Sequence, residues 1–108
     1  MFDSKLLPAP DEFGTFMHPD IPMNFEEWDD FFPNCSHNIE VVSFVDEQPQ
    51  YLTKEPINGI RRFKSIDTEE YIKIIKLWKP PVPKGNNWQL IAKITCETGP
   101  IAFFAQPK

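Results

Sequence analysis

Residues 88–105 read WQLIAKITCETGPIAFFA. Two runs rich in β-branched and aromatic residues flank the turn-like segment 97–100, so the pattern predicts a β-hairpin. Every second residue of 88–96 is apolar, which predicts that these residues share one face of a strand. Ile91 and Phe103 break the strict alternation, and we therefore expect both faces of the hairpin to be covered.

The segment that precedes the hairpin predicts an amphipathic helix over residues 67–78. Asp67 lies three residues before Glu70, which is the spacing of a capping box, and Pro80 ends the helix. Apolar residues recur at helical spacing on one face, which we expect to pack on the sheet. They are Tyr71, Ile74, Ile75 and Trp78.

Three further short strands are predicted upstream, over residues 39–45, 50–53 and 60–64. With the hairpin they give an α+β fold, in which an antiparallel sheet of four to five strands carries one packed helix, 67–78.

The N-terminal segment predicts an extended arm followed by a short acidic helix. Four prolines interrupt residues 1–23, and each removes a backbone donor, so we expect an extended Pro-rich arm that packs on the domain. Residues 24–32 predict a helix with Asn24 as its N-cap, which Pro33 ends. Phe25, Trp28 and Phe32 recur along one face of this helix.

Length and composition predict one domain over residues 1–108. The chain is 41% hydrophobic and 25% charged, as expected for a globular protein. We read no export signal at the start and no apolar stretch of membrane length, so we expect a cytoplasmic protein that does not enter membranes. Cys35 and Cys96 are then reduced thiols. Cys96, in a predicted strand, is expected to be buried and unreactive.

Charge divides the chain into two unequal halves. Residues 1–54 hold 11 carboxylates against 2 lysines, a balance of −9, and residues 55–108 hold 5 against 9 cations, a balance of +4. An acidic half of this kind argues against direct nucleic-acid binding, which needs a basic stripe.

Catalytic and metal-binding motifs are absent from the sequence. Zinc sites usually show two close ligand pairs, whereas only Cys35 and His37 form one here. No serine lies in a glycine-flanked elbow and no glycine-rich loop could hold phosphate. We expect a non-enzymatic protein without metal or cofactor. The alternative is a small metal-binding protein or enzyme that uses His18, Cys35 and His37.

Aromatic side chains interleaved with carboxylates predict a protein-binding surface, because such anchors dominate interfaces. A host protein with a basic surface fits this charge. One alternative is an acidic nucleic-acid mimic that blocks a DNA-binding protein, and a homodimer formed through a free hairpin edge is another option. The predicted partner-binding residues are Glu26, Glu27, Trp28, Asp29, Asp30 and Phe31.

Residues 78–88, WKPPVPKGNNW, and residues 98–104, TGPIAFF, resemble the tail of small uncharacterised proteins encoded by phages and prophages. The resemblance covers about thirty residues and implies an accessory protein of a mobile element. Such proteins are often small acidic inhibitors of host machinery. The resemblance assigns no functional residues.

Overall fold

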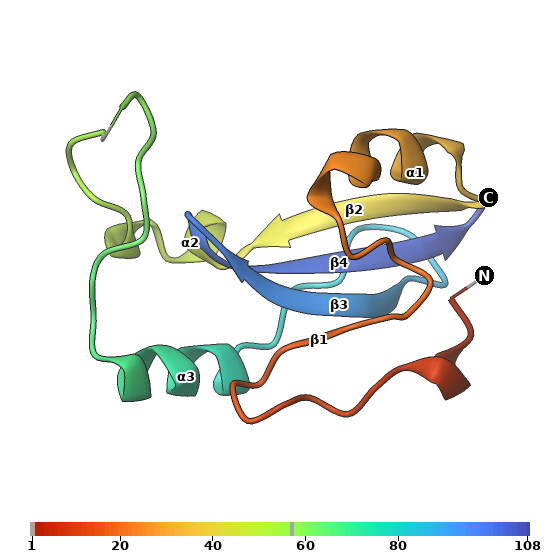
Figure 1. Cartoon of the computed structure of the whole chain (residues 1–108), viewed down its shortest axis with the longest axis horizontal. Helices are drawn as coiled ribbons and strands as arrows, with labels where there is room; N and C mark the ends of the chain where they lie inside the picture. The colour runs from red at the N-terminus through yellow and green to blue at the C-terminus, as the bar shows by residue number, and fades with distance from the viewer. Residues whose placement is uncertain (1, 57) are drawn as a thin grey trace.

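A computed structural model describes residues 2–56 and 58–108, and a four-stranded antiparallel sheet forms its centre (Figure 1). The strand order is β1-β3-β4-β2. This arrangement confirms the α+β class and the antiparallel sheet. The strands are β1 (Phe16–Met17), β2 (His37–Ser43), β3 (Gln89–Cys96) and β4 (Gly99–Pro107).

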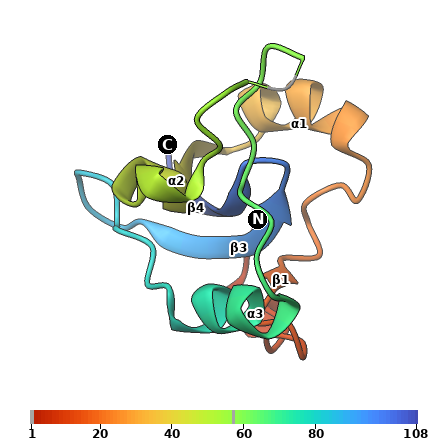
Figure 2. The same ribbon diagram turned by 90° about the vertical axis from the view of Figure 1, so that its left-hand side faces the viewer.

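Each face of the sheet carries its own hydrophobic cluster, because neighbouring residues of a strand point to opposite sides. In β4, Phe103 belongs to the upper cluster and Phe104 to the lower cluster. Helix α1 (Trp28–Asn34) lies above the sheet and α3 (Thr68–Leu77) lies below it (Figures 1 and 2). The upper cluster comprises Phe2, Ile21, Ile91, Ala92, Phe103 and Ala105, and the lower cluster comprises Phe44, Val45, Trp78, Ala102 and Phe104. The expected cover on both faces is thus confirmed.

Strands β3 and β4 form the predicted hairpin, with Glu97 and Thr98 as its turn. Cys96 pairs with Gly99, so Gly99 already belongs to β4. Gly99 has a φ of +104°, which residues with a side chain rarely adopt. A Cβ added at Gly99 would collide with the ring of Phe63. The turn therefore requires glycine for both its backbone and its packing.

A β-bulge at Ile91 changes the side on which the residues of β3 point. The register with β4 shifts between Leu90 and Ala92. Leu90 packs on the lower cluster, whereas Ala92 belongs to the upper one. The prediction that alternate residues of 88–96 share one face is therefore wrong, because the extra residue reverses the alternation beyond it. Lys93 consequently points to the lower side.

Helix α3 lies within the range that the sequence predicts. Its stripe buries Ile75, and Trp78 follows as the C-cap residue with only 9% of its surface exposed. The side chain of Asp67, the N-cap residue, makes no capping hydrogen bond, so the predicted capping box does not form. With 10 residues, α3 is shorter than any membrane span, and no helix within 2–56 and 58–108 is long and apolar enough for one.

The predicted strand over residues 39–45 is wrong in part. The strand β2 ends at Ser43, and Phe44–Glu47 form a short helix, α2. In a strand, Phe44 and Val45 would point to opposite faces, whereas in α2 both are buried in the lower cluster. Burial of two adjacent apolar residues on one side therefore favours the helical turn.

Residues 50–53 and 60–64 do not form the two predicted strands. A 3₁₀ turn, η3, spans Pro49–Tyr51, and an isolated bridge joins Leu52 to Phe63. Pro49, directly before the first segment, and Pro56, three residues after it, lack the backbone N–H that a longer ladder would need. The fourth strand of the sheet is supplied by the arm.

Phe2 and Ile21 are buried in the upper cluster, and the chain between them runs along the lower side of the sheet and returns along its edge (Figure 1). Residues 2–23 contain a 3₁₀ turn, η1 (Ser4–Leu6), and β1, which pairs with β3. The pairing is extended by His18, whose N–H donates to the carbonyl of Ile91 at 2.8 Å. Met1, the first residue of the predicted arm, lies outside the described residues.

Candidate functional site

The four carboxylates of the predicted binding surface lie on α1 and on the 3₁₀ turn before it, η2 (Phe25–Glu27). All four side chains are exposed. Among residues 2–56 and 58–108, no lysine or arginine forms an ion pair with any of them. We call this group the acidic surface; it consists of Glu26, Glu27, Asp29 and Asp30.

Local capping holds the acidic surface in place. The side chain of Asn24 accepts a hydrogen bond from the N–H of Glu26 at 3.1 Å, which confirms Asn24 as the N-cap. Helix α1 continues through Pro33, so the prediction that Pro33 ends the helix is wrong. Pro33 stands in the last turn, where Asn34 Nδ2 donates to the carbonyl of Asp30 at 2.7 Å and closes the helix.

The aromatic residues of α1 point towards the core. The ring centroid of Trp28 lies 5.1 Å from that of Phe103, and its Nε1 donates to the carbonyl of Pro22 at 2.6 Å. Phe31 contacts Phe2 edge-on, with centroids 6.4 Å apart. Of the six predicted partner-binding residues, the four carboxylates thus face solvent, while Trp28 and Phe31 pack against the upper cluster.

Two exposed apolar side chains border the acidic surface. Met23 is 89% exposed and Phe25 is 66% exposed. With Met17 and Ile94 they line a hollow of about 190 Å³. Neither Met23 nor Phe25 belongs to the six predicted partner-binding residues. Met23 and Phe25 flank the N-cap Asn24, and this position indicates exposure, because a side chain at the start of a helix has few neighbours to pack against.

The basic half of the chain does not neutralise the acidic half through ion pairs. Arg62 pairs with Glu97, at 3.6 Å, and both belong to residues 55–108. In the acidic half, Asp20 lies 3.8 Å from the ring nitrogen Nδ1 of His18. Within the described ranges, no carboxylate of residues 1–54 is paired with a lysine or arginine. All eleven Asp and Glu residues of this half are exposed.

Comparison with known proteins finds no matching family model, no matching curated protein and no matching solved structure. The resemblance of residues 78–88 and 98–104 to phage-encoded proteins stays a prediction.

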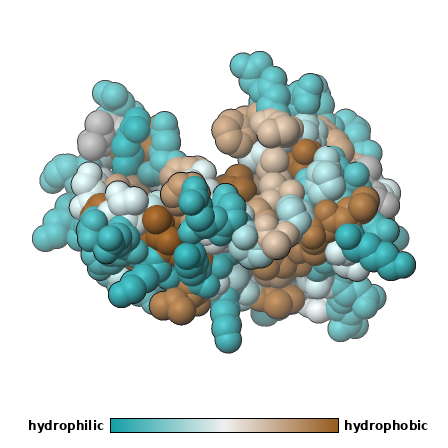
Figure 3. Space-filling model, turned by 60° about the horizontal axis from the view of Figure 1, so that its bottom comes forward, coloured by the Kyte–Doolittle hydropathy of each residue, from teal (hydrophilic) through white to brown (hydrophobic). Residues whose placement is uncertain are grey.

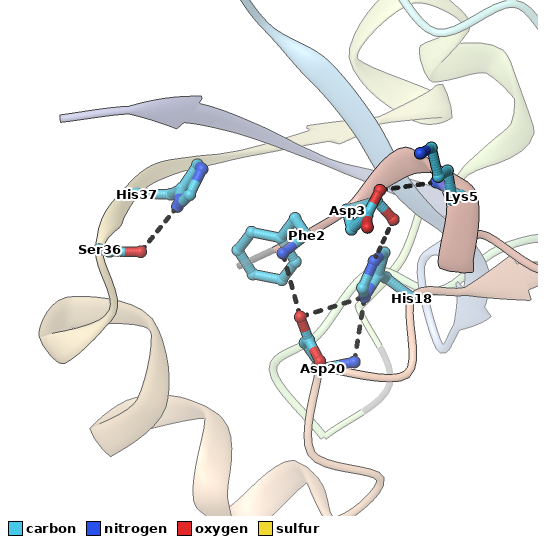
Figure 4. A network of polar contacts seen from close by, with 7 residues as sticks. All are labelled: Phe2, Asp3, Lys5, His18, Asp20, Ser36 and His37. Carbon is cyan, nitrogen blue, oxygen red and sulfur yellow. Dashed lines mark hydrogen bonds and ion pairs between the residues drawn. The ribbon is translucent and has the colours of Figure 1, made fainter.

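His18 and His37, the histidines of the metal hypothesis, are separated by the ring of Phe2 (Figure 4). The ring centroid of Phe2 lies 5.4 Å from that of His18 and 5.2 Å from that of His37. Backbone groups use both nitrogens of His18: Nδ1 accepts from the N–H of Asp20 at 3.0 Å, and Nε2 contacts the carbonyl of Asp3 at 2.8 Å. Since Nδ1 accepts, Nε2 carries the proton and donates. His18 thus fastens the arm and offers no free lone pair to a metal ion.

The two cysteines occupy different environments, and neither forms a disulfide. Cys35 is buried, and its Sγ lies 3.2 and 3.1 Å from the carbonyl oxygens of Phe32 and His37, which share its one S–H donor. Cys96 is exposed at the end of β3, which contradicts its expected burial. Burial lowers the pKa of the neighbouring His37 ring. Across the described part of the chain, no three His, Cys, Asp or Glu side chains converge into a metal-binding group.

A larger hollow, which we call the lower pocket, has a volume of about 630 Å³. It lies where three segments that are separated in the sequence meet. Residues 10–16 of the arm, residues 76–82 at the end of α3, and residues 88–104 of the sheet contribute its walls. Lys93 is only 7% exposed, and its Nζ donates to the carbonyl of Trp78 at 2.9 Å. The bulge turns Lys93 into this pocket, on the same side of the sheet as Leu90.

Burial in the lower pocket lowers the pKa of Lys93 below its usual 10.5. Between the lowered pKa and 10.5 the unfolded chain binds more protons than the folded one, so stability rises with pH there. We expect wild type to gain free energy of unfolding relative to Lys93→Met between pH 8 and pH 10, measured by urea unfolding. Tyr71, whose pKa burial raises, contributes equally to both proteins. If the free energies of unfolding of wild type and Lys93→Met change in parallel with pH, the lowered pKa of Lys93 is contradicted.

Proposed function

We propose that this chain is a non-enzymatic protein-binding module that docks its acidic surface on a basic surface of a host protein. The observation that carries the proposal is that four adjacent carboxylates are exposed and form no ion pair with a cation of the described chain. Negative charge that is not compensated internally attracts a complementary partner and accelerates association.

The hollow beside the acidic surface gives the proposed interface an apolar anchor. Interfaces take most of their affinity from a few buried apolar or aromatic side chains surrounded by a polar rim. Phe25 and Met23 provide such an anchor, and Glu26 and Glu27 belong to the rim. Trp28 and Phe31 support this surface from beneath rather than touching the partner.

The resemblance of residues 78–88 and 98–104 to small phage and prophage proteins supports a more specific role. We propose that the chain is an accessory protein of a mobile element that inhibits a cytoplasmic protein of its host. Inhibition requires no catalytic group, since occupation of a functional surface is sufficient.

Neutralising the acidic surface tests the proposal. The wild-type chain first serves as the bait that captures host proteins, which mass spectrometry identifies. The variant carries Glu26→Gln, Glu27→Gln, Asp29→Asn and Asp30→Asn. We expect the captured partner to bind this variant at least about tenfold more weakly than wild type. Wild-type binding should also weaken strongly as salt rises from about 0.05 to 0.5 M, and the variant's binding should depend less on salt.

A matched control separates the acidic surface from net charge. Glu55→Gln, Asp67→Asn, Glu69→Gln and Glu70→Gln remove the same charge from exposed positions elsewhere. If both quadruple variants lose the partner equally, the interaction is non-specific and the proposal fails. If the partner binds DNA and DNA displaces the chain, the nucleic-acid mimic becomes the better description.

A further inference from the structure

We propose that the lower pocket binds a small organic monoanion with a planar apolar body, of the aromatic carboxylate class. Its walls come from the arm, the end of α3 and the sheet. Helix α3 lies on the opposite face of the sheet from α1, which carries part of the acidic surface (Figures 1 and 2). The lower pocket is therefore independent of the proposed protein-binding function. Figure 3 views the molecule from below and shows apolar side chains at the surface there, bordered by hydrophilic ones.

The size and lining of the lower pocket suit a small aromatic molecule. Its volume of about 630 Å³ falls within the usual range of small-molecule sites, roughly 300–1,000 Å³. Such sites combine apolar walls with a few polar groups that fix orientation. The aromatic residues of this lining are Phe16, Trp78, Trp88 and Phe104.

A buried ammonium group supplies the polar contact. Lys93 carries three N–H donors, and within the described residues its only hydrogen-bond partner is the carbonyl of Trp78. Donors left without partners in an apolar site are costly, and a ligand carboxylate would satisfy them. The charge balance of the lining is positive, since Lys76 and Lys79 also contribute to it.

The single carboxylate in the lining does not compete for these cations. Asp11 uses Oδ1 to accept from the N–H groups of Phe13 and Thr15, both at 2.9 Å. Its Oδ2 accepts from the hydroxyl of Thr15 at 2.8 Å. These hydrogen bonds lower the pKa of Asp11, with the backbone N–H of Thr15 as the largest contribution. Asp11 is thus engaged in its own loop and leaves Lys93 unpaired.

Carboxylates fit the lower pocket better than phosphates do. Phosphate sites typically use arginine forks or the N-terminus of a helix. Here no arginine contributes to the lining, and α3 presents its C-terminal end, which carries negative partial charge. One buried ammonium beside that helix end matches a ligand with a single negative charge.

A matched pair of probes tests the proposal: 2-naphthoate and its uncharged amide, 2-naphthamide. We expect 2-naphthoate to bind wild type with a Kd at least tenfold lower than that of 2-naphthamide, measured by isothermal titration calorimetry. In two-dimensional NMR spectra, 2-naphthoate should shift the indole N–H signals of Trp78 and Trp88. The signal of Trp28, which packs on the upper cluster, should stay unchanged.

Two lysine variants complete the test. Lys93→Met should bring the Kd of 2-naphthoate to that of 2-naphthamide, whereas Lys54→Met, an exposed control outside the pocket lining, should leave it unchanged. If Lys93→Met does not fold, the double variant Lys76→Gln/Lys79→Gln should still weaken 2-naphthoate binding about threefold or more. Equal affinity of wild type for the two probes, no binding at 1 mM, or a shifted Trp28 signal overturns the proposal.

Discussion

Replacing Gly99 with alanine will lower the free energy of unfolding by about 4 kcal/mol. Two costs combine at this position. The φ of +104° is one that alanine rarely adopts, and the new methyl group would lie 2.8 Å from Cε2 of Phe63 and closer still to Cδ2. The Phe63 ring cannot easily retreat, because it stacks on Tyr51 with centroids 5.5 Å apart and contacts Tyr71 at 5.0 Å. Urea unfolding monitored by tryptophan fluorescence measures the change.

Gly59 provides the matched control for the two costs. Its φ is +81°, yet among the described residues a Cβ there would meet no atom within 4 Å beyond its chain neighbours, so Gly59→Ala isolates the backbone cost at about 1 kcal/mol. In a Phe63→Leu background, Gly99→Ala should lower the free energy of unfolding by less, since the smaller side chain relieves the collision. Equal losses for Gly59→Ala and Gly99→Ala would show that the ring contact does not limit the hairpin.

Truncating Trp28 to alanine will lower the free energy of unfolding by about 3 kcal/mol. Its indole contacts Phe103 and Phe32, at centroid distances of 5.1 and 5.7 Å, and its N–H satisfies the carbonyl of Pro22. The variant loses these contacts and leaves that carbonyl without its partner. Thermal and urea unfolding both report the loss.

Phe25→Ala is the control for Trp28→Ala, because Phe25 is a neighbouring aromatic residue on the solvent side. With 66% of its surface exposed, its removal should change stability by only about 0.5 kcal/mol. If Phe25 anchors a partner, its loss will instead weaken binding. An equal stability loss from the two variants would mean that Trp28 does not hold α1 on the sheet. Binding tests should therefore alter Phe25 and the carboxylates and leave Trp28 intact.

The elements with strong periodicity could be predicted from the sequence. The stripe from Tyr71 to Trp78 predicts α3, and the flanked turn at 97–100 predicts the hairpin. Short segments could not be predicted, because tertiary packing decides them. Phe44 and Val45 have strand propensity, yet burial of both on one side favours a helical turn.

For the candidate site, the exposure of the charged residues could be predicted from the sequence, whereas the orientation of the aromatic residues could not. Burying an unpaired carboxylate is costly, so the side of α1 that packs on the sheet is the side without carboxylates, and Asp29 and Asp30 are exposed. Which aromatics turn inward depends on the rotation of α1 on the sheet, and the spacing of Phe25 and Trp28 alone does not reveal it. Lys93 could not be found at all, because its position depends on the bulge.

Because of the bulge at Ile91, the side chains that line the lower pocket depend on the number of residues in β3. The extra residue of the bulge reverses the alternation of side chains along β3. Leu90 and Lys93, three residues apart, therefore point to the same side of the sheet. If Ile91 instead joined a regular ladder, the ammonium group would either emerge among the aromatic rings beneath α1 or force the strand to slide. Single-residue insertions or deletions near position 91 could therefore exchange a charged hollow for an apolar one without altering any residue that lines it.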